Sequence, residues 1–239
     1  MQILGFQVQG CGEGMIGKIS AIVVDIDGTI TDENLRLSLN AIKALRRAEE
    51  RGYPVILASG NTLPVMYGLR MYLGFSGAII AENGCVVEYK DRVEVLGRQE
   101  RAREAMEVLK KMYGARELFT NRWRMAEVGL YASISFQDVQ KVAEEFGLKA
   151  ENTGFAYHIS EEGMSKYEAL KVAARLMNIE VDSALAIGDG ENDLSLLKNL
   201  NRSATHSMAP ESVKKVAKYV AKARYGDAIE EILRYYGVL

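Results

Sequence analysis

Short, continuous apolar runs recur along the chain and alternate with segments of helical periodicity. The runs are rich in Val, Ile, Leu and Ala, and each has the length of a strand buried on both faces. They cover residues 19–24, 54–58, 78–80 and 184–187. Apolar positions three and four apart predict helices beside these runs. The helices cover residues 38–51, 63–73, 165–177 and 192–200. Strands that alternate with helices predict a parallel sheet joined by right-handed crossovers.

The C-terminal part of the chain continues this alternation. It predicts a strand at residues 203–205, a helix after Pro210, a short strand at 219–220 and a helix over 227–236. The expected fold class is therefore α/β, with a Rossmann-like core around a parallel sheet.

The middle of the chain has a different pattern, with alternating or aromatic strands. The predicted strands cover residues 86–89, 93–96, 124–128, 131–134 and 155–159, and the predicted helices cover 99–113 and 137–146. Such a pattern is typical of an antiparallel sheet covered on one face by helices. We expect an inserted α+β cap domain at residues 85–158, and a core domain made of residues 1–84 and 159–239. Residues 1–17 precede the first strand and are expected to be an N-terminal extension.

Composition narrows the range of functions. With 48% hydrophobic and 26% charged residues and a net charge of -2, the chain resembles an ordinary globular protein without a basic field for nucleic acid. A small anion needs only a local site. Cys11 and Cys85 are too few for a disulfide framework, which favours a cytoplasmic protein. No apolar run approaches the ~18 residues of a membrane span.

The first candidate site follows the first apolar run. Asp25 and Asp27 stand where a buried strand stops, and Gly28 permits a tight turn after them. Buried carboxylates this close together are costly unless a cation offsets their charge, so a shared divalent metal would explain the pattern. A strand that ends in a polar turn is the simpler alternative. An EF-hand loop is excluded, because its further acidic positions and its terminal glutamate are missing.

A second buried strand ends in Ser59, Gly60 and Asn61, and Pro64 is placed for the first turn of the next helix. A hydroxyl, a flexible backbone and a helix N-terminus together form a cradle for an anion. Taken alone, this pattern also fits an ordinary polar loop.

Two further segments carry polar residues at helix starts. Ser165 and Glu168 fit a capping box, which places Lys166 where the helix dipole disfavours a cation unless an anion lies nearby. Asp189, Asn192 and Asp193 follow another buried strand. Capping accounts for one of these two acids and leaves Asp189 unexplained. All four segments fall at the C-terminal edge of one parallel sheet, where α/β folds bind ligands.

The order DIDGT, SGN, SK and GDGEND resembles the haloacid dehalogenase superfamily of phosphatases, over the whole core of the chain. The insertion after the second motif resembles the larger α/β cap class of that superfamily. The short cap, the junction at residues 81–84 and Ser-Gly-Asn at the second motif look most similar to archaeal phosphoglycolate phosphatases.

The resemblance implies a mechanism. Asp25 would attack phosphorus and form an aspartyl phosphate, while Asp27 would protonate the leaving alcohol and then activate water. The dehalogenase branch is disfavoured, because a second acid at Asp27 serves phosphoryl transfer.

The resemblance also implies a set of ligands. Mg²⁺ would be held by the Asp25 side chain, the Asp27 backbone carbonyl and Asp189, with Asp193 completing the shell and Asn192 orienting it. Ser59, the amides of Gly60 and Asn61, and Lys166 would bind the phosphoryl oxygens. Many relatives carry arginine where Asn61 stands, so no side-chain role is expected for Asn61.

The substrate implied by the resemblance is a small phosphorylated metabolite, with 2-phosphoglycolate the leading choice. Arg122 and Arg124 are candidates for binding a substrate carboxylate, although a solvated strand edge is the simpler and favoured explanation for them. The alternatives are a sugar-phosphate or broad-specificity phosphatase, a phosphomutase, and a non-catalytic regulator that binds phosphate or metal. The sequence leaves open a homodimer through the cap and the choice between Mg²⁺ and Mn²⁺.

Overall fold

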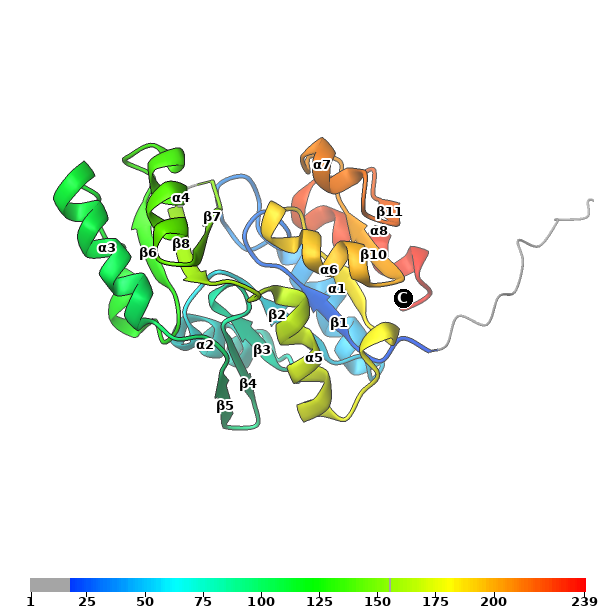
Figure 1. The fold of residues 1–239 in the computed structure, drawn as a ribbon. Coiled ribbons are helices and arrows are strands. Elements are labelled where there is room, and N and C mark those ends of the chain that lie inside the picture. The colour runs from blue at the N-terminus through cyan, green and yellow to red at the C-terminus, as the bar shows by residue number, and fades with distance from the viewer. Residues whose placement is uncertain (1–17, 155) are drawn as a thin grey trace, which may run out of the picture.

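The computed structural model describes residues 18–154 and 156–239. Residues 1–17, predicted to be an N-terminal extension, lie outside the described part. Figure 1 shows a larger unit built around one sheet and a smaller unit formed by the middle of the chain. The α/β fold class with an inserted α+β unit is confirmed.

The sheet of the larger unit carries the predicted parallel strands. Its strands cover Ile22–Val24 (β1), Val55–Ala58 (β2), Ile79–Ala81 (β3), Val86–Tyr89 (β4), Arg92–Val95 (β5), Leu185–Ile187 (β9), Arg202–Thr205 (β10) and Tyr219–Val220 (β11). In the described part of the chain their order is β11-β10-β9-β1-β2-β3-β4-β5. The strands from β11 to β3 are all parallel. Val23 lies opposite both Ile56 and Ala186, so β1 is central.

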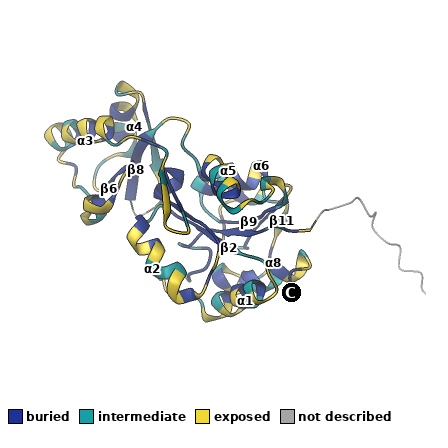
Figure 2. Cartoon of the chain, turned by 90° about the horizontal axis from the view of Figure 1, so that it is seen from below, coloured by how far each residue is buried: buried dark blue, intermediate teal, exposed yellow. Residues whose placement is uncertain are grey.

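Helices cover both faces of this sheet, as Figure 2 shows. One layer consists of Leu39–Glu50 (α1), Leu63–Leu73 (α2) and Ala228–Tyr235 (α8). The other consists of Lys166–Met177 (α5), Leu194–Asn199 (α6) and Glu211–Lys214 (α7). On β1, the side chains of Ile22 and Val24 pack in the first core, whereas Val23 packs in the second. Burial on both faces explains why the strand is a continuous apolar run.

Two strands that we expected in the inserted sheet belong to the main sheet instead. Residues 86–89 and 93–96 were predicted to open the insertion, but they correspond to β4 and β5, and β4 pairs antiparallel with β3. The chain reverses directly after β3, so β4 extends the same sheet. Val86 and Val87 are buried in the two opposite cores. The alternating pattern therefore predicted the antiparallel pairing correctly, but the two strands were assigned to the inserted sheet and belong to the main sheet.

The smaller unit is an antiparallel sheet of order β6-β8-β7. It is formed by Val128–Tyr131 (β6), Leu148–Asn152 (β7) and Ala156–Glu161 (β8), and it packs against Glu100–Tyr113 (α3) and Phe136–Glu145 (α4). In place of the predicted strands at 124–128 and 131–134 the structure has one strand, β6, where the two predictions meet, and β7 was not predicted. The sequence of β7, Leu-Lys-Ala-Glu-Asn, lacks the β-branched and aromatic residues that mark strands.

The two faces of the small sheet differ in character. Val128, Leu130 and Ile159 face the two helices in an apolar core. Gly129 pairs with His158 in the register of β6 and β8, and these residues point to the opposite face. That face is turned toward the larger unit.

The pairing of β4 and β5 bears on where the insertion begins. We propose that the inserted unit runs from about residue 96 to about residue 161, rather than over 85–158. The supporting observation is that β5 pairs only with β4 of the main sheet, while β8 extends to Glu161 within the small sheet.

The junction between β3 and β4 is the 3₁₀ turn Glu82–Gly84. All three residues have positive φ angles of 51°, 53° and 100°. A Cβ atom added at Gly84 would lie 2.3 Å from the carbonyl oxygen of Ser165, at the start of α5. Only glycine lets the junction and the helix approach this closely.

We predict that Gly84→Ala destabilises the fold and that Gly163→Ala does so much less. Gly163 also has positive φ, but nothing lies within 4 Å of its added Cβ atom, so it reports the backbone strain alone. The overpacking at Gly84 adds about 1–3 kcal/mol of destabilisation. Urea unfolding of both variants measures the difference, and equal free energies of unfolding would contradict this account.

Candidate functional site

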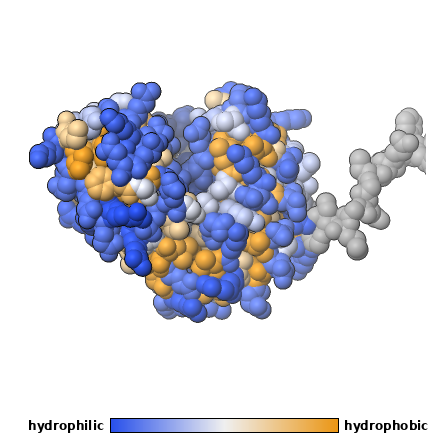
Figure 3. Space-filling view, viewed as in Figure 1, coloured by the Kyte–Doolittle hydropathy of each residue, from blue (hydrophilic) through white to orange (hydrophobic). Residues whose placement is uncertain are grey.

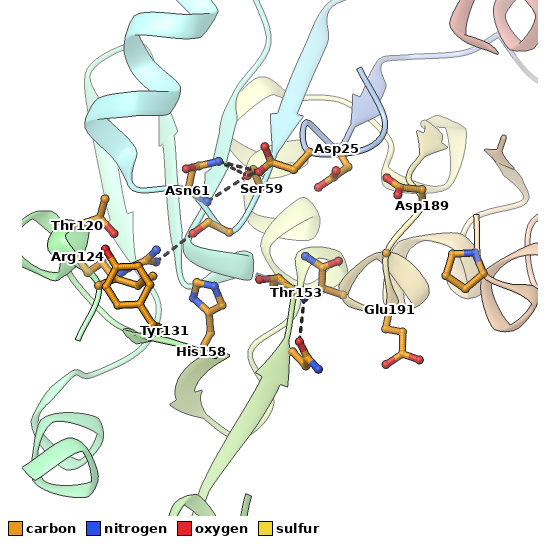
Figure 4. A pocket seen from close by; sticks show the side chains of 18 of the residues that line it. Asp25, Ser59, Asn61, Thr120, Arg124, Tyr131, Thr153, His158, Asp189 and Glu191 are labelled. Atoms are coloured by element: carbon orange, nitrogen blue, oxygen red, sulfur yellow. Dashed lines mark hydrogen bonds between the residues drawn. The ribbon is translucent and has the colours of Figure 1, made fainter. Parts of the chain in front are cut away.

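The predicted site residues meet at one edge of the main sheet. β1, β2 and β9 are neighbouring parallel strands, and their carboxyl ends lead directly into Asp25, Ser59 and Gly188. Because parallel strands end at the same edge, residues far apart in the sequence become neighbours there. Figure 4 shows Asp25, Ser59, Asn61 and Asp189 around one cavity.

Lys166 joins the first and fourth motifs. Its ammonium nitrogen lies 2.5 Å from Asp25 Oδ1 and 2.6 Å from Asp193 Oδ1. Lys166 is only 1% exposed, so the ammonium group has exchanged water for these two carboxylates. The helix dipole disfavours a cation at the start of a helix, and these two carboxylates are the nearby anions that offset this effect.

Burial and charge act against each other in this cluster. Burial raises the pKa of Asp25 well above its usual range, and Asp193 raises it further, while Lys166 opposes the shift. Burial disfavours the charged form of Lys166, but Asp193 and Asp25 hold the pKa of its ammonium group above the usual range. A further positive charge would therefore stabilise the ionised form of Asp25.

Asp189 lies next to this pair. Burial, followed by the charge of Asp193, raises the pKa of Asp189 to about 6. The Thr29 hydroxyl donates a hydrogen bond to Asp189 Oδ1. Gly28 has φ +88°, and a Cβ atom there would lie 2.5 Å from Asp189 Oδ2. Gly28 therefore permits the turn and also lets the first motif lie close to Asp189 of the fourth motif.

Three carboxylates form a group that could hold a metal ion. Asp25, Asp189 and Asp193 each offer an oxygen, and these oxygens lie within 4.8 Å of one another. Oxygen-only donors suit hard divalent cations such as Mg²⁺. The raised pKa values of Asp25 and Asp189 mark an excess of negative charge that such an ion would offset. The donor set therefore fits a divalent cation.

Asp27 is held by the second motif, and here one prediction was wrong. The Asn61 side-chain amide donates to Asp27 Oδ2 at 2.9 Å, although no side-chain role was expected for Asn61. It also donates to Ser59 Oγ at 3.1 Å. Burial raises the pKa of Asp27, while Lys166 and the hydrogen bonds from Asn61 and Ser59 oppose the shift. The spacing in the sequence could not reveal this contact, because it joins loops after two different strands.

Asn192, which we expected to orient a metal shell, reaches the junction after β3. Its amide donates to Asn83 Oδ1 at 3.0 Å. Asn83 in turn donates to Glu127 Oε2 at 3.1 Å, so a hydrogen-bonded path leads from the fourth motif into the inserted unit. No role was predicted for Asn83 or Glu127: the polar junction after a buried strand was a signal for Asn83, and no pattern in the sequence marked Glu127.

A cavity of about 710 Å³ lies between the sheet edge and the inserted unit. Figure 3 shows a notch between the two lobes on the surface. The core side of the cavity is lined by Asp25, Asp27 and the Ser59–Asn61 loop, and the opposite side by Arg124, Tyr131 and His158. The dimensions suit a small molecule.

The two arginines named from the sequence lie in different places. Arg124 is buried and lines the cavity. Arg122 is exposed, and its guanidinium group stacks on the rings of Phe119 and Trp123 at 4.2 and 5.3 Å from the ring centroids. Only Arg124 is therefore placed to meet a ligand in this cavity.

Within the described ranges, no helix combines the length and apolar character that crossing a membrane requires. Access to the cavity is through the notch between the two units.

Comparison with known proteins identifies the family of the chain. A model of the haloacid dehalogenase-like hydrolases matches residues 22–127 and 135–233. The phosphoglycolate phosphatase of Methanothermobacter thermautotrophicus is 37% identical over 214 residues, which are 90% of this chain and 97% of that protein. The crystal structure of Thermoplasma acidophilum 0175 superposes with a TM-score of 0.87 at 31% identity, covering 93% of this chain and all of that one.

A more distant structure shares the fold. The subclass IIB sugar phosphatase BT4131 superposes with a TM-score of 0.78 at 18% identity, over 92% of this chain and all of that one. The family match extends across the main sheet and the inserted unit. The chain belongs to the haloacid dehalogenase-like hydrolase family, and it is an enzyme of the phosphatase type.

Proposed function

We propose that the protein is a Mg²⁺-dependent phosphatase that hydrolyses 2-phosphoglycolate to glycolate and phosphate through an aspartyl phosphate on Asp25. One observation carries the proposal: the nucleophile, a proton-holding acid and a buried ammonium group converge at one sheet edge. Lys166 contacts Asp25, and Asp27 lies beside Ser59 in the same cavity.

In the first half of the reaction, an oxygen of Asp25 forms a bond to phosphorus while the bond from phosphorus to the substrate oxygen breaks. Lys166 engages Asp25 Oδ1, and within the described chain no hydrogen bond occupies Oδ2. Asp27 gives its proton to the departing alcohol oxygen. Its raised pKa favours holding that proton until it is needed.

In the second half, Asp27 takes a proton from water, and the water oxygen attacks phosphorus. The bond from phosphorus to Asp25 breaks, which releases phosphate and restores both carboxyl groups. Asn61 keeps Asp27 in place for both proton transfers, since its amide bonds Asp27 Oδ2.

Charge on the phosphoryl group is met by fixed donors. The Ser59 hydroxyl, the backbone amides of Gly60 and Asn61, and the Lys166 ammonium group would bind the phosphoryl oxygens, since the Ser59–Asn61 loop lines the cavity and Lys166 contacts Asp25. Asp25, Asp189 and Asp193 would hold Mg²⁺ together with the backbone carbonyl of Asp27. The ion supplies positive charge that offsets the carboxylates and the phosphoryl oxygens.

The choice of substrate rests on the relatives and on the cavity. The relatives that are 31–37% identical over nearly the whole chain are named phosphoglycolate phosphatases. The opposite wall of the cavity offers Arg124, a cation that a neutral sugar does not require. A sugar-phosphate phosphatase is the second candidate, because the subclass IIB sugar phosphatase shares this fold.

The first prediction concerns turnover. Phosphoglycolate should give the highest kcat/KM in a panel of small phosphoesters with Mg²⁺, and a chelator should abolish release of phosphate. Asp25→Asn should lower kcat by several orders of magnitude, as expected when a covalent nucleophile is lost. Leading activity on sugar phosphates would refute the substrate, and full activity of Asp25→Asn would refute the mechanism.

The second prediction separates the two roles of Asp27. With p-nitrophenyl phosphate, whose leaving group needs no proton, Asp27→Asn should release a burst of about one equivalent of nitrophenol per site and then stall. With ethyl phosphate it should give no burst, because an alkoxide leaves poorly without a proton. Steady nitrophenol release at the wild-type rate would contradict the base role of Asp27.

The third prediction concerns the metal. Asp189→Asn should weaken Mg²⁺ binding at least tenfold, given that even outer-shell partners of metal sites contribute roughly 10- to 100-fold. Asp182→Asn is the matched control, since Asp182 is exposed at the opposite end of β9. Calorimetric titration of Mg²⁺ measures both variants, and equal affinities would place the metal elsewhere.

A further inference from the structure

A buried carboxylate organises the wall of the cavity that faces Asp25. Glu127 is 0% exposed, and its Oε1 accepts hydrogen bonds from Arg124 Nη1 and from His158 Nδ1, the latter at 2.9 Å. Its Oε2 accepts from Asn83 at 3.1 Å. Burial disfavours the charge, but His158 and Arg124 hold the pKa of Glu127 below its usual range. Glu127 is therefore an ionised anchor for two cation-forming side chains.

These two side chains keep donor groups that the described part of the protein does not use. Arg124 is 7% exposed and His158 is 2% exposed, and both line the cavity. Among the described residues, no hydrogen-bond partner engages Arg124 Nη2 or His158 Nε2. Figure 4 shows the two side chains close together, with Asp25 across the cavity. Arg124 Nε is buried and has no hydrogen-bond partner in the described part of the protein, and a buried polar nitrogen without a partner indicates a ligand.

A second contact holds Arg124 close to the Ser59–Asn61 loop, which is here called the phosphate loop. Arg124 Nη1 also donates to the Gly60 carbonyl oxygen at 3.0 Å. Gly60 lies between Ser59 and Asn61, which are proposed to bind the phosphoryl group. The guanidinium group is thus held next to the phosphate loop, and a group bound by Nη2 must be joined to the phosphate by a short linker.

The backbone around Glu127 is held in place by Glu82, a residue of the larger unit. Glu82, at a positive φ of 51°, accepts hydrogen bonds from the backbone amides of Met125, Ala126 and Glu127 at 2.9–3.2 Å. Such strained backbone persists only where surrounding contacts hold it, and it is common at ligand sites. The segment that carries Arg124 is therefore clamped by the junction after β3.

From these observations we propose that Arg124 and His158 form a subsite for a second anionic group of the substrate. This group is the carboxylate of a short phosphorylated acid. Glu127 is the positioning residue that orients both side chains. The inference rests on the proposed function for the reaction at Asp25. An arginine has five donors and no acceptor, so its unused edge selects a carboxylate over a hydroxyl that must also donate. His158 places a second ring nitrogen, Nε2, without a partner among the described residues in the same cavity.

A purely structural role is the competing explanation. The same contacts could simply fasten the inserted unit to the core through Gly60 and Asn83. In that case, loss of the cluster would impair every substrate equally. Two substrates that differ only in the second anionic group separate the explanations, namely phosphoglycolate and ethyl phosphate, in which a methyl group replaces the carboxylate.

The experiment compares kcat/KM for these two compounds in wild type and Arg124→Lys. A charged hydrogen bond contributes about 10- to 100-fold in affinity, so the ratio of phosphoglycolate to ethyl phosphate should fall at least tenfold, mainly through a higher KM for phosphoglycolate. Arg122→Lys, two residues earlier in the sequence and outside the cavity lining, should leave the ratio unchanged. Thermal unfolding of each variant confirms that it folds.

Glu127→Gln and Glu127→Asp test the positioning role. Gln keeps the size but replaces an acceptor oxygen by a donor, so the ratio should fall, and Asp should recover part of it because it keeps the carboxylate. Equal losses on both substrates, or a wild-type ratio near one, would overturn the subsite. Failure of wild type to hydrolyse either compound would instead refute the proposed phosphatase function.

Discussion

The buried ammonium group of Lys166 is the interaction on which the site depends. It lies between Asp25 and Asp193, which come from the loops after β1 and β9, while Lys166 itself opens α5. Three carboxylates at one buried sheet edge require positive charge beside them, because their like charges repel one another. Lys166 balances part of that charge, and the remaining part defines a place for a divalent cation.

The charged groups can balance one another only if they lie close together, and the ends of neighbouring parallel strands bring them together. β1 and β9 stop in register and β2 ends one residue further along, so Asp25, Gly188 and Ser59 begin their loops at nearly the same height. Glycines at 28 and 84 then let neighbouring segments approach to distances that a Cβ atom would forbid. The scaffold holds the reacting groups in place before a substrate arrives, which lowers the reorganisation needed during the reaction.

The inserted unit adds selectivity to this chemistry. Its helices bury one face of a small sheet, and the other face carries His158 toward the cavity. The contacts from Glu127 to Asn83 and from Arg124 to Gly60 connect that face to the core. The part of the protein that would recognise the organic portion of a substrate is thus tied to the part that would bind its phosphate.

The sequence was most informative where chemistry follows a buried strand. The runs before Asp25, Ser59 and Asp189 are apolar on both faces, so they predicted both the parallel sheet and the edge where these residues meet. Contacts between loops could not be predicted, because nothing in a linear spacing joins Asn61 to Asp27 or Asn83 to Glu127. The assignment of β4 and β5 failed for a related reason: alternation identifies an antiparallel pair but does not say which sheet it extends.

Chemical trapping of the phosphorylated residue tests the central claim most directly. Enzyme quenched during turnover of phosphoglycolate would be treated with borohydride, which reduces an aspartyl phosphate to homoserine, and its peptides would be analysed by mass spectrometry. This account predicts the modification at Asp25 and at no other carboxylate. A modification at Asp27 or Asp189, or a phosphate found on a serine or histidine, would contradict it.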